Sequence, residues 1–231
     1  MTGAARPPAG LELLDDPAAD PATVRTSLRN IARANRWFGG RWAFRNALDR
    51  MLGSPPAGST ITLLDVGTGA GDLPRTAEAW AGGRGCRLTS LGIEPHPVAA
   101  RLARESGLRV LRASGCQLPL RSRSVDVVLV SQVAHHLEPA ALTALLRECD
   151  RVARQAVIVS DLRRSAVARF AFWVGARLLR FDPATRRDGL LSIRRGFSAD
   201  ELRSGLRGAD LRGRVWRSPG FRLVAAWRPG H

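Results

Sequence analysis

The sequence predicts an α/β fold: a doubly wound, mostly parallel sheet that ends in an antiparallel hairpin. Two observations carry this prediction. Strand-like and helix-like segments alternate regularly from residue 61 to residue 160, and such alternation produces parallel strands through right-handed crossovers. The segment after residue 210 breaks the pattern with two strand-like runs around a short turn. A chain of 231 residues suits one such domain with added helices.

The first part of the chain predicts a tail followed by helices. Residues 1–22 are rich in proline and alanine and have no apolar periodicity, so we expect a disordered tail. Residues 23–58 place apolar side chains at helical spacing on both sides of Gly39 and Gly40, which predicts two helices. We expect these helices to form a lid on the main domain, residues 59–231.

Five apolar runs bounded by turn residues predict the parallel strands. They cover residues 61–66, 88–93, 108–112, 125–131 and 156–160. Three segments with helical apolar spacing lie between them, at residues 72–81, 97–105 and 139–153. Pro139 in the first turn marks the start of the last of these helices.

Residues 162–197 are too long a segment for an ordinary connection, so we expect a helical cap insertion there. The stretch "SAVARFAFWVGARLLRF" has one apolar helical face. Its members are Val167, Phe170, Val174, Leu178 and Phe181. Three interpretations stay open: a helix packed on the core, a cap over a hydrophobic substrate, and a helix on a membrane surface.

The C-terminal part begins with a capping box. Ser198 and Glu201 stand three residues apart, which predicts a helix from that point to about residue 207. The stretch "RGRVWRSPGFRLVAAW" then reads as a strand, a turn and a strand. We therefore expect an antiparallel hairpin beside the parallel sheet.

The charge and the cysteines narrow the class of protein. A net charge of +16 would favour a nucleic-acid partner, but all 36 basic residues are arginine in a chain rich in Ala, Gly and Pro. This bias is compositional, so nucleic acid is not the expected partner. The three cysteines lack a C-x-x-C pair, so neither a disulfide framework nor a metal site is expected.

Targeting signals are not expected in this chain. The apolar runs are shorter than the roughly 20 residues that span a bilayer. The first 20 residues are interrupted by proline and acids, unlike a signal peptide. We therefore expect a cytoplasmic location without a transmembrane segment.

The stretch "LLDVGTGAG" predicts a loop that binds a nucleoside at the end of the first strand. Its glycines are Gly67, Gly69 and Gly71, and Asp72 stands where a dinucleotide fingerprint needs a third glycine. A carboxylate there disfavours the pyrophosphate of NAD. Asp65 at the strand end suits a positively charged ligand, and S-adenosylmethionine carries an ammonium and a sulfonium.

The same stretch resembles the first motif of class I S-adenosylmethionine-dependent methyltransferases, which have a Rossmann-like fold. "LTSLGIEPHPVAARLARE" and "CQLPLRSRSVDVVLVSQVAHHLEP" resemble the next motifs of the methyltransferase-11 group, which includes ubiquinone and menaquinone methyltransferases. The resemblance implies that Glu94 accepts hydrogen bonds from the ribose hydroxyls. It places Ser114 where relatives usually have an aspartate for the adenine amino group. The cofactor residues that it implies are Asp65, Gly67, Thr68, Gly69, Gly71, Glu94, Pro95, Ser114, Gly115, Cys116 and Ser131.

A narrower resemblance concerns "NRWFGG" and "RRDGLLSIRRGFSADEL". Both are similar to a bacterial subgroup associated with specialised metabolism, including polyketide pathways. This implies a methyltransferase for a small hydroxylated aromatic or polyketide-like acceptor, with O-methylation favoured over C-methylation. An RNA or DNA methyltransferase and a non-catalytic S-adenosylmethionine-binding protein are the alternatives. Peripheral membrane contact and the oligomeric state stay open.

The acceptor side of the site has fewer sequence signals. A phenolic hydroxyl needs a base, and an imidazole suits that role at neutral pH. His136 is the first candidate and His135 the second, since both follow the fourth strand at its carboxyl end. Asp161 ends the fifth strand, where it would orient a histidine or contact the acceptor. The candidate walls of the acceptor pocket are Trp37, Phe38, Phe170 and Trp173.

Overall fold

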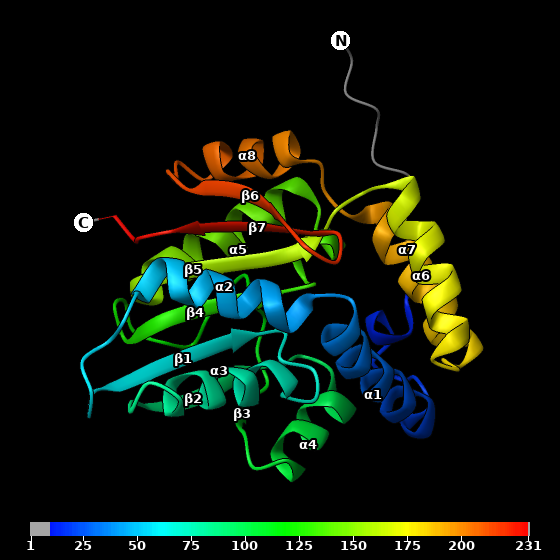
Figure 1. Cartoon of the computed structure of the whole chain (residues 1–231), viewed down its shortest axis with the longest axis horizontal. Coiled ribbons are helices and arrows are strands. Elements are labelled where there is room, and N and C mark those ends of the chain that lie inside the picture. Colours follow the sequence, from blue (N-terminus) through cyan, green and yellow to red (C-terminus); the bar gives the residue numbers. More distant parts are fainter. Residues whose placement is uncertain (1–9, 231) are drawn as a thin grey trace.

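The computed structural model describes residues 10–230 and contains a seven-stranded sheet of order β3-β2-β1-β4-β5-β7-β6 (Figure 1). The first five strands are parallel, and β7 is antiparallel to β5 and to β6. The predicted α/β fold with a C-terminal hairpin is therefore confirmed. The strands are β1 (Thr60–Val66), β2 (Arg87–Ile93), β3 (Arg109–Leu111), β4 (Val125–Ser131), β5 (Ala153–Leu162), β6 (Arg214–Ser218) and β7 (Arg222–Trp227).

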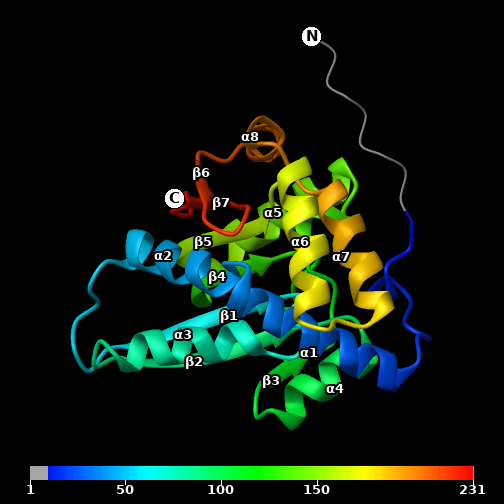
Figure 2. The same ribbon diagram turned by 45° about the vertical axis from the view of Figure 1, so that its right-hand side comes forward.

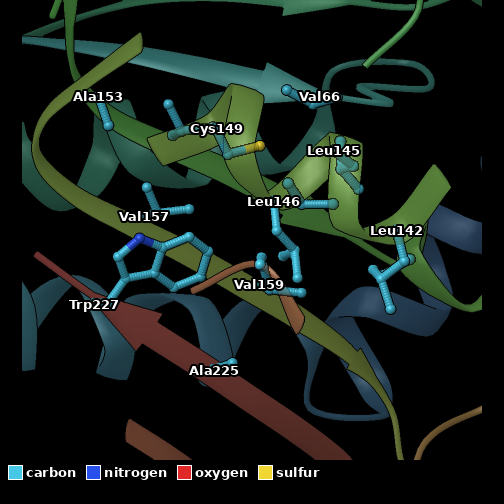
Figure 3. Close-up of a cluster of buried hydrophobic side chains, with 14 of the residues drawn as sticks. Val66, Leu142, Leu145, Leu146, Cys149, Ala153, Val157, Val159, Ala225 and Trp227 are labelled. Atoms are coloured by element: carbon cyan, nitrogen blue, oxygen red, sulfur yellow. The ribbon is translucent and has the colours of Figure 1, made fainter. Parts of the chain in front are cut away.

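Helices cover both faces of the sheet. One face packs against α2 and α3, and the other packs against α5 and α8. Figure 3 shows part of the second core, where Leu146 of α5 lies near Val159 of β5 and Trp227 of β7. The helices are α1 (Pro21–Trp37), α2 (Gly40–Leu52), α3 (Asp72–Gly82), α4 (Pro97–Glu105), α5 (Pro139–Val152), α6 (Ala166–Leu178), α7 (Pro183–Arg195) and α8 (Ala199–Gly208), with short 3-10 turns η1 (Leu13–Asp15) and η2 (Ala134–His136).

The strand order reverses between β1 and β4, because β1 pairs with β2 on one side and with β4 on the other. Open α/β sheets bind ligands at such a switch point, beyond the carboxyl ends of the strands. Figures 1 and 2 show α6 and α7 side by side beyond this edge of the sheet. The two helices of the predicted insertion thus form a roof over the carboxyl edge, and we call them the roof.

The predicted tail needs a correction from residue 10 onward. Residues 10–20 pack against the roof, because Glu12 binds Arg195 and the backbone N–H of Leu13 donates to Asp188. Helix α1 then begins at Pro21, with Asp20 as its N-cap. Residues 1–9 and residue 231 lie outside the described part of the chain. The sequence misses the packed segment because long-range polar contacts, not apolar periodicity, hold it in place.

The predicted N-terminal lid also needs a correction. Helix α2 packs on the sheet, and its Phe44 and Leu48 are fully buried in the core against that face. Helix α1 behaves differently, since it packs against α4 and α7 and ends near the carboxyl edge of the sheet. Of the two helices predicted to form the lid, only α1 therefore lies beside the carboxyl edge of the sheet.

Candidate functional site

A cavity of about 420 Å³ lies between the carboxyl edge of the sheet and the roof. Its floor is formed by the loops after β1, β2 and β4, and its upper walls come from α1, α6 and α7. The volume falls in the range of about 300 to 1,000 Å³ that is usual for small-molecule sites. One continuous cavity thus joins the predicted cofactor loop to the predicted acceptor region.

The glycine loop after β1 has the backbone that only glycine adopts readily. The φ angles of Gly67, Gly69 and Gly71 are 72°, 55° and 74°. A Cβ atom on Gly67 would lie 2.3 Å from Cγ2 of Val133, so a side chain cannot be accommodated there. Gly71 caps α3 and does not line the cavity.

Three buried acids surround this loop. Oδ2 of Asp65 accepts a hydrogen bond from the Thr68 hydroxyl over 2.7 Å. Oε2 of Glu94 accepts one from the Gly69 backbone N–H over 2.8 Å. Burial raises the pKa of Asp65 to about 7, despite the Thr68 bond, and the neighbouring Asp72 and Glu94 add to the rise. Burial also raises the pKa values of Asp72 and Glu94.

This arrangement fits a cationic ligand. Asp72 has Arg41 at 3.9 Å, but no arginine of residues 10–230 forms an ion pair with Asp65 or Glu94. A bound positive charge relieves the cost of burying such carboxylates. The ammonium and sulfonium of S-adenosylmethionine match the requirement, whereas a pyrophosphate would repel the three acids. The loop glycines allow the ligand to approach the backbone closely.

Nearly all of the predicted cofactor residues line this cavity. Besides the loop, the lining includes Ser114, whose Oγ accepts a hydrogen bond from the backbone N–H of Cys116 over 3.2 Å. Gly71 is the exception. The predicted residues on the cavity surface are Asp65, Gly67, Thr68, Gly69, Glu94, Pro95, Ser114, Gly115, Cys116 and Ser131.

His135 lines the cavity and forms a buried pair with Asp161, which is not part of the lining. Nδ1 of His135 lies 2.7 Å from Oδ1 of Asp161, and the His135 backbone N–H donates to Oδ2 over 3.1 Å. Burial alone would raise the pKa of Asp161, but the interactions with His135 and the backbone N–H of Leu162 hold it below its usual range. An ionised carboxylate only accepts, so Nδ1 carries the proton and Nε2 is the basic nitrogen of the ring.

His136 has a different environment. Its Nδ1 lies 3.1 Å from Oδ1 of Asp15, and its Nε2 lies 3.6 Å from Oε2 of Glu12. Burial alone would lower the pKa of His136, but the hydrogen bond with Asp15 and the charges of Glu12 and Asp15 raise it. The interaction with His136 likewise helps to lower the pKa of Asp15 to about 2, against the effect of its burial. The two carboxylates thus favour the protonated form of His136.

Glu12 connects this ion pair to the roof. Its Oε1 accepts a hydrogen bond from Nη1 of Arg195 over 2.9 Å, and its Oε2 accepts one from the Ser192 hydroxyl over 2.7 Å. Glu12, His135 and His136 each offer one atom that could bind a metal ion, and these three atoms lie within 4.8 Å of one another. Because both oxygens of Glu12 already accept hydrogen bonds, we interpret the group as an ion-pair network.

Three of the four predicted acceptor walls lie elsewhere. Trp37, Phe170 and Trp173 are exposed, by 63%, 67% and 44%, and do not line the cavity. Trp37 ends α1. On α6, Ala168 and Phe172 face the cavity, whereas Phe170 and Trp173 face solvent. Phe38 does line the cavity. Its aromatic neighbours there are Phe172, Phe181 and Phe221.

Several polar residues of the cavity carried no sequence signal that we recognised. Asn35 accepts hydrogen bonds at Oδ1 from Gln132 and Arg222 and donates through Nδ2 to Asp72. Gln132 has a φ of 57°, an uncommon conformation that directly follows β4. Asn35 begins the "NRWFGG" stretch, in which only the aromatic residues predict pocket walls. Arg222 is one of 36 arginines, so the sequence does not distinguish it from the others.

Comparison with known proteins supports the assignment of the central region. A family model described as "Methyltransferase domain" matches residues 64–159. An uncharacterized methyltransferase from Mycolicibacterium vanbaalenii is 42% identical over 81 residues, which cover 33% of this chain. The aligned region spans 29% of that relative's own length.

Solved structures share the fold across most of the chain. An S-adenosylmethionine-dependent methyltransferase from Aquifex aeolicus has a TM-score of 0.61 and 19% identity, covering 91% of this chain and 99% of its own. A magnesium protoporphyrin IX methyltransferase from Synechocystis, with bound S-adenosylhomocysteine, has a TM-score of 0.53 and 12% identity, covering 84% and 83%. At such identities the likeness shows the fold alone. The match to the methyltransferase family model and the geometry of the glycine loop indicate S-adenosylmethionine as the cofactor. Residues 64–159 therefore match the methyltransferase family, and the chain has the fold of S-adenosylmethionine-dependent methyltransferases.

Proposed function

We propose that this protein transfers a methyl group from S-adenosylmethionine to a hydroxyl group of a small aromatic or polyketide-like metabolite. The observation that carries the proposal is His135, which is paired with the buried Asp161 and lines the same cavity as the glycine loop. A base beside the cofactor site suits a hydroxyl acceptor that must lose a proton. C-methylation of an activated ring is the close variant.

The residues that would hold the cofactor surround the loop after β1. Asp65 and Glu94 offer carboxylates, Gly67 and Gly69 permit close approach, and Ser114 stands near the end of the groove. When bound, S-adenosylmethionine supplies an electrophilic methyl carbon on a sulfonium. The protein must orient the acceptor oxygen in line with that carbon and exclude water. The roof and α1 suit the second task because they cover the cavity.

We assign the role of base to His135 and not to His136, which the sequence favours. Nε2 of His135 would take the proton of the acceptor hydroxyl, and Asp161 would stabilise the imidazolium that forms. His136 is less suited, since its raised pKa favours the protonated ring, which cannot accept a proton. Its ion pair with Asp15 instead fixes the N-terminal segment beside the cavity.

The upper half of the cavity supports a small acceptor. Its apolar wall includes Phe38, Phe172 and Phe181, and α6 and α7 cover it. Such a covered space favours a small ring system over a nucleic-acid strand. The His135–Asp161 pair argues against a protein that only binds the cofactor. A role in specialised metabolism and a cytoplasmic location stay predictions.

The experiment that tests this function is a transfer assay with labelled S-adenosylmethionine. The purified chain is incubated with a small-molecule extract of its source organism, and mass analysis identifies what gains a methyl group. A labelled small molecule with a methylated hydroxyl is the expected result. Labelled RNA or DNA under the same conditions, with no labelled small molecule, would contradict the proposal.

We further propose that the outer face of α6 contacts an anionic lipid surface. Phe170 and Trp173 stack there with ring centroids 6.1 Å apart, and Val167 and Leu178 are exposed on the same helix. The Arg177 guanidinium lies 3.9 Å from the centre of the Trp173 ring. Aromatic side chains with flanking arginines are typical of helices that lie in a membrane interface. No helix within residues 10–230 is long and apolar enough to cross a bilayer.

A further inference from the structure

Arg222 is a buried cation on the cavity wall. It begins β7, where it pairs with Leu162 of β5, and only 2% of its surface is exposed. Its Nη2 donates to Oδ1 of Asn35 over 3.3 Å. Its Nε and Nη1 have no hydrogen-bond partner among residues 10–230. A buried guanidinium with two unused donors is costly unless an acceptor completes it.

The acids near Arg222 are already engaged. Asp161 accepts the hydrogen bonds of His135, and Asp72 accepts those of Asn35. Burial lowers the pKa of Arg222 to about 10, although the charges of Asp161 and Asp72 oppose this shift. The side chain therefore remains a cation at neutral pH. It lies in the cavity without a carboxylate of its own.

Arg163 adds a second guanidinium to the same wall. Its backbone N–H donates to the carbonyl of Phe221, its guanidinium lies 5.4 Å from the centre of the Phe221 ring, and its Nε is buried without a partner in the described chain. Phe221 directly precedes Arg222 in the chain and has a φ of 58°. A bulky residue in that conformation is strained, and such strain concentrates at functional sites.

We propose that Arg222 and Arg163 form an anion subsite for a carboxylate or ionised hydroxyl of the methyl acceptor. This inference rests on the proposed function and gives the acceptor a chemical class: an aromatic or polyketide-like molecule with an anionic oxygen. The unpartnered Nε–H and Nη1–H of Arg222 point to different edges of the guanidinium, and each can donate a charge-assisted hydrogen bond to an anionic oxygen in the cavity. The aromatic walls would hold the ring, while the subsite fixes its orientation relative to His135.

The cofactor has a carboxylate too, so the test must separate the two sources. Calorimetry first measures S-adenosylhomocysteine and its decarboxylated analogue on the parent protein and on Arg222→Met. Benzoate and its neutral analogue benzamide are then titrated into each protein saturated with S-adenosylhomocysteine. Arg228→Met serves as the control, since Arg228 is exposed at the other end of β7 and donates to the Met51 carbonyl.

The expected result is that the parent complex binds benzoate at least tenfold more tightly than benzamide. Arg222→Met should abolish this preference, Arg163→Met should reduce it, and Arg228→Met should preserve it. S-adenosylhomocysteine should bind all four proteins equally. Equal binding of benzoate and benzamide by the parent would overturn the proposal. A loss in Arg222→Met confined to S-adenosylhomocysteine, absent for the decarboxylated analogue, would assign Arg222 to the cofactor and also overturn it.

Thermal unfolding separates a binding role from a structural one. Replacing a buried, incompletely paired charge by an apolar side chain of similar size is usually neutral or stabilising. Arg222→Met without ligands should therefore unfold at the parent temperature or above it. A lower unfolding temperature together with unchanged benzoate binding would show that Arg222 serves the fold alone. Failure of S-adenosylhomocysteine to bind the parent would instead contradict the proposed function, independently of the subsite.

Discussion

Glu12 and Arg195, 183 residues apart in the chain, form a buried ion pair in which Nη1 of Arg195 lies 2.9 Å from Oε1 of Glu12. Arg195 ends α7, and its Nη2 also donates to the carbonyl of Gly10. The N-terminal segment is thereby attached to the roof at the point where Glu12 and Asp15 face His136. The stability of the roof and the position of His136 are consequently linked.

Glu12→Gln should loosen this attachment. The change leaves Arg195 and His136 without their shared carboxylate, which should lower the free energy of unfolding by about 1 to 3 kcal/mol. It should also raise the acceptor KM, because the segment borders the upper cavity, while cofactor affinity stays constant. Denaturant unfolding and steady-state kinetics measure the two effects.

The exposed pair of Arg203 and Asp200 on α8 provides a matched control, with 2.8 Å between Nη1 and Oδ1. Arg203→Gln should change the free energy of unfolding by less than about 0.5 kcal/mol, because exposed pairs contribute little. Equal effects of Glu12→Gln and Arg203→Gln would mean that the N-terminal segment is not anchored as described.

The sheet core was predictable because its local signals agree. The apolar run of β4 was predicted at its observed bounds, and the capping box at Ser198 marks the start of α8. β5 is longer than its apolar run, because its ends pair with β4 and β7 and the pairing partners decide where a strand ends. Local sequence signals thus predict the order of the helices and strands, whereas the length of a strand depends on the strands with which it pairs.

The upper half of the cavity was harder to predict. Helix α6 is apolar around most of its circumference, so its sequence does not reveal that Ala168 is buried while Phe170 is exposed. Glu12 acts through contacts with residues 180 and 183 positions away, and sequence patterns do not report such contacts. Arg222 has no sequence feature that other arginines lack, because its burial depends on the hairpin geometry.

The raised pKa of Asp65 predicts a pH-dependent cofactor affinity. Burial raises this pKa to about 7, and a cationic ligand requires the ionised carboxylate. S-adenosylmethionine affinity should therefore increase roughly tenfold between pH 5.5 and 7, below the range where the ligand's own amino group titrates. Calorimetry at several pH values measures this, and Asp65→Asn should bind weakly with little pH dependence. A flat profile in the parent would exclude Asp65 from the cationic site.

The raised pKa of Asp65 also affects the stability of the protein without ligand, which should fall as the pH rises, whereas cofactor affinity should increase. Since the folded pKa of Asp65 lies above its unfolded value, the folded state holds a proton that the unfolded state releases between about pH 4 and 7. This contribution to stability is fully present below that window and is lost as the pH rises through it. Saturating S-adenosylmethionine should reduce the dependence, which thermal unfolding at matched pH values checks.

Gly189→Ala should deform the roof. A Cβ atom on Gly189 would lie 2.2 Å from Cζ of Phe172, so the ring or α7 must move. Such overpacking costs about 1 to 3 kcal/mol, and it should change the acceptor KM because Phe172 lines the cavity. Gly82→Ala is the control, since a Cβ there meets no atom within 4 Å. Equal stability of both variants would contradict the packing of Phe172 on α7.

Phe170→Ser combined with Trp173→Ser tests the outer face of α6. The parent should sediment with vesicles that contain phosphatidylglycerol and phosphatidylcholine, and less with phosphatidylcholine alone. The double variant should lose most of this binding, while Trp42→Ser, at an exposed tryptophan on α2, should retain it. Unchanged sedimentation of the double variant would show that another basic surface binds the vesicles.

His135→Ala tests the assignment of the base. Removing a general base should lower the methyl-transfer rate by about 10² to 10⁴, and cofactor affinity should change little because the glycine loop stays intact. Activity should partly recover at high pH, where a phenolic acceptor ionises without help. Single-turnover kinetics across pH, with a chelator present to exclude a contaminating cation, provides the measurement.

His136→Ala distinguishes the neighbouring histidines, because the two variants remove different partners. Loss of the ion pair with Asp15 should lower stability and raise the acceptor KM, yet leave the pH profile of the transfer step close to that of the parent. Asp161→Asn should resemble His135→Ala, since it removes the carboxylate that fixes the Nδ1 proton. If His136→Ala instead abolishes the imidazole-like limb while His135→Ala keeps it, the base is His136. If both variants keep the parent profile with transfer rate-limiting, catalysis rests on proximity alone, as expected for C-methylation.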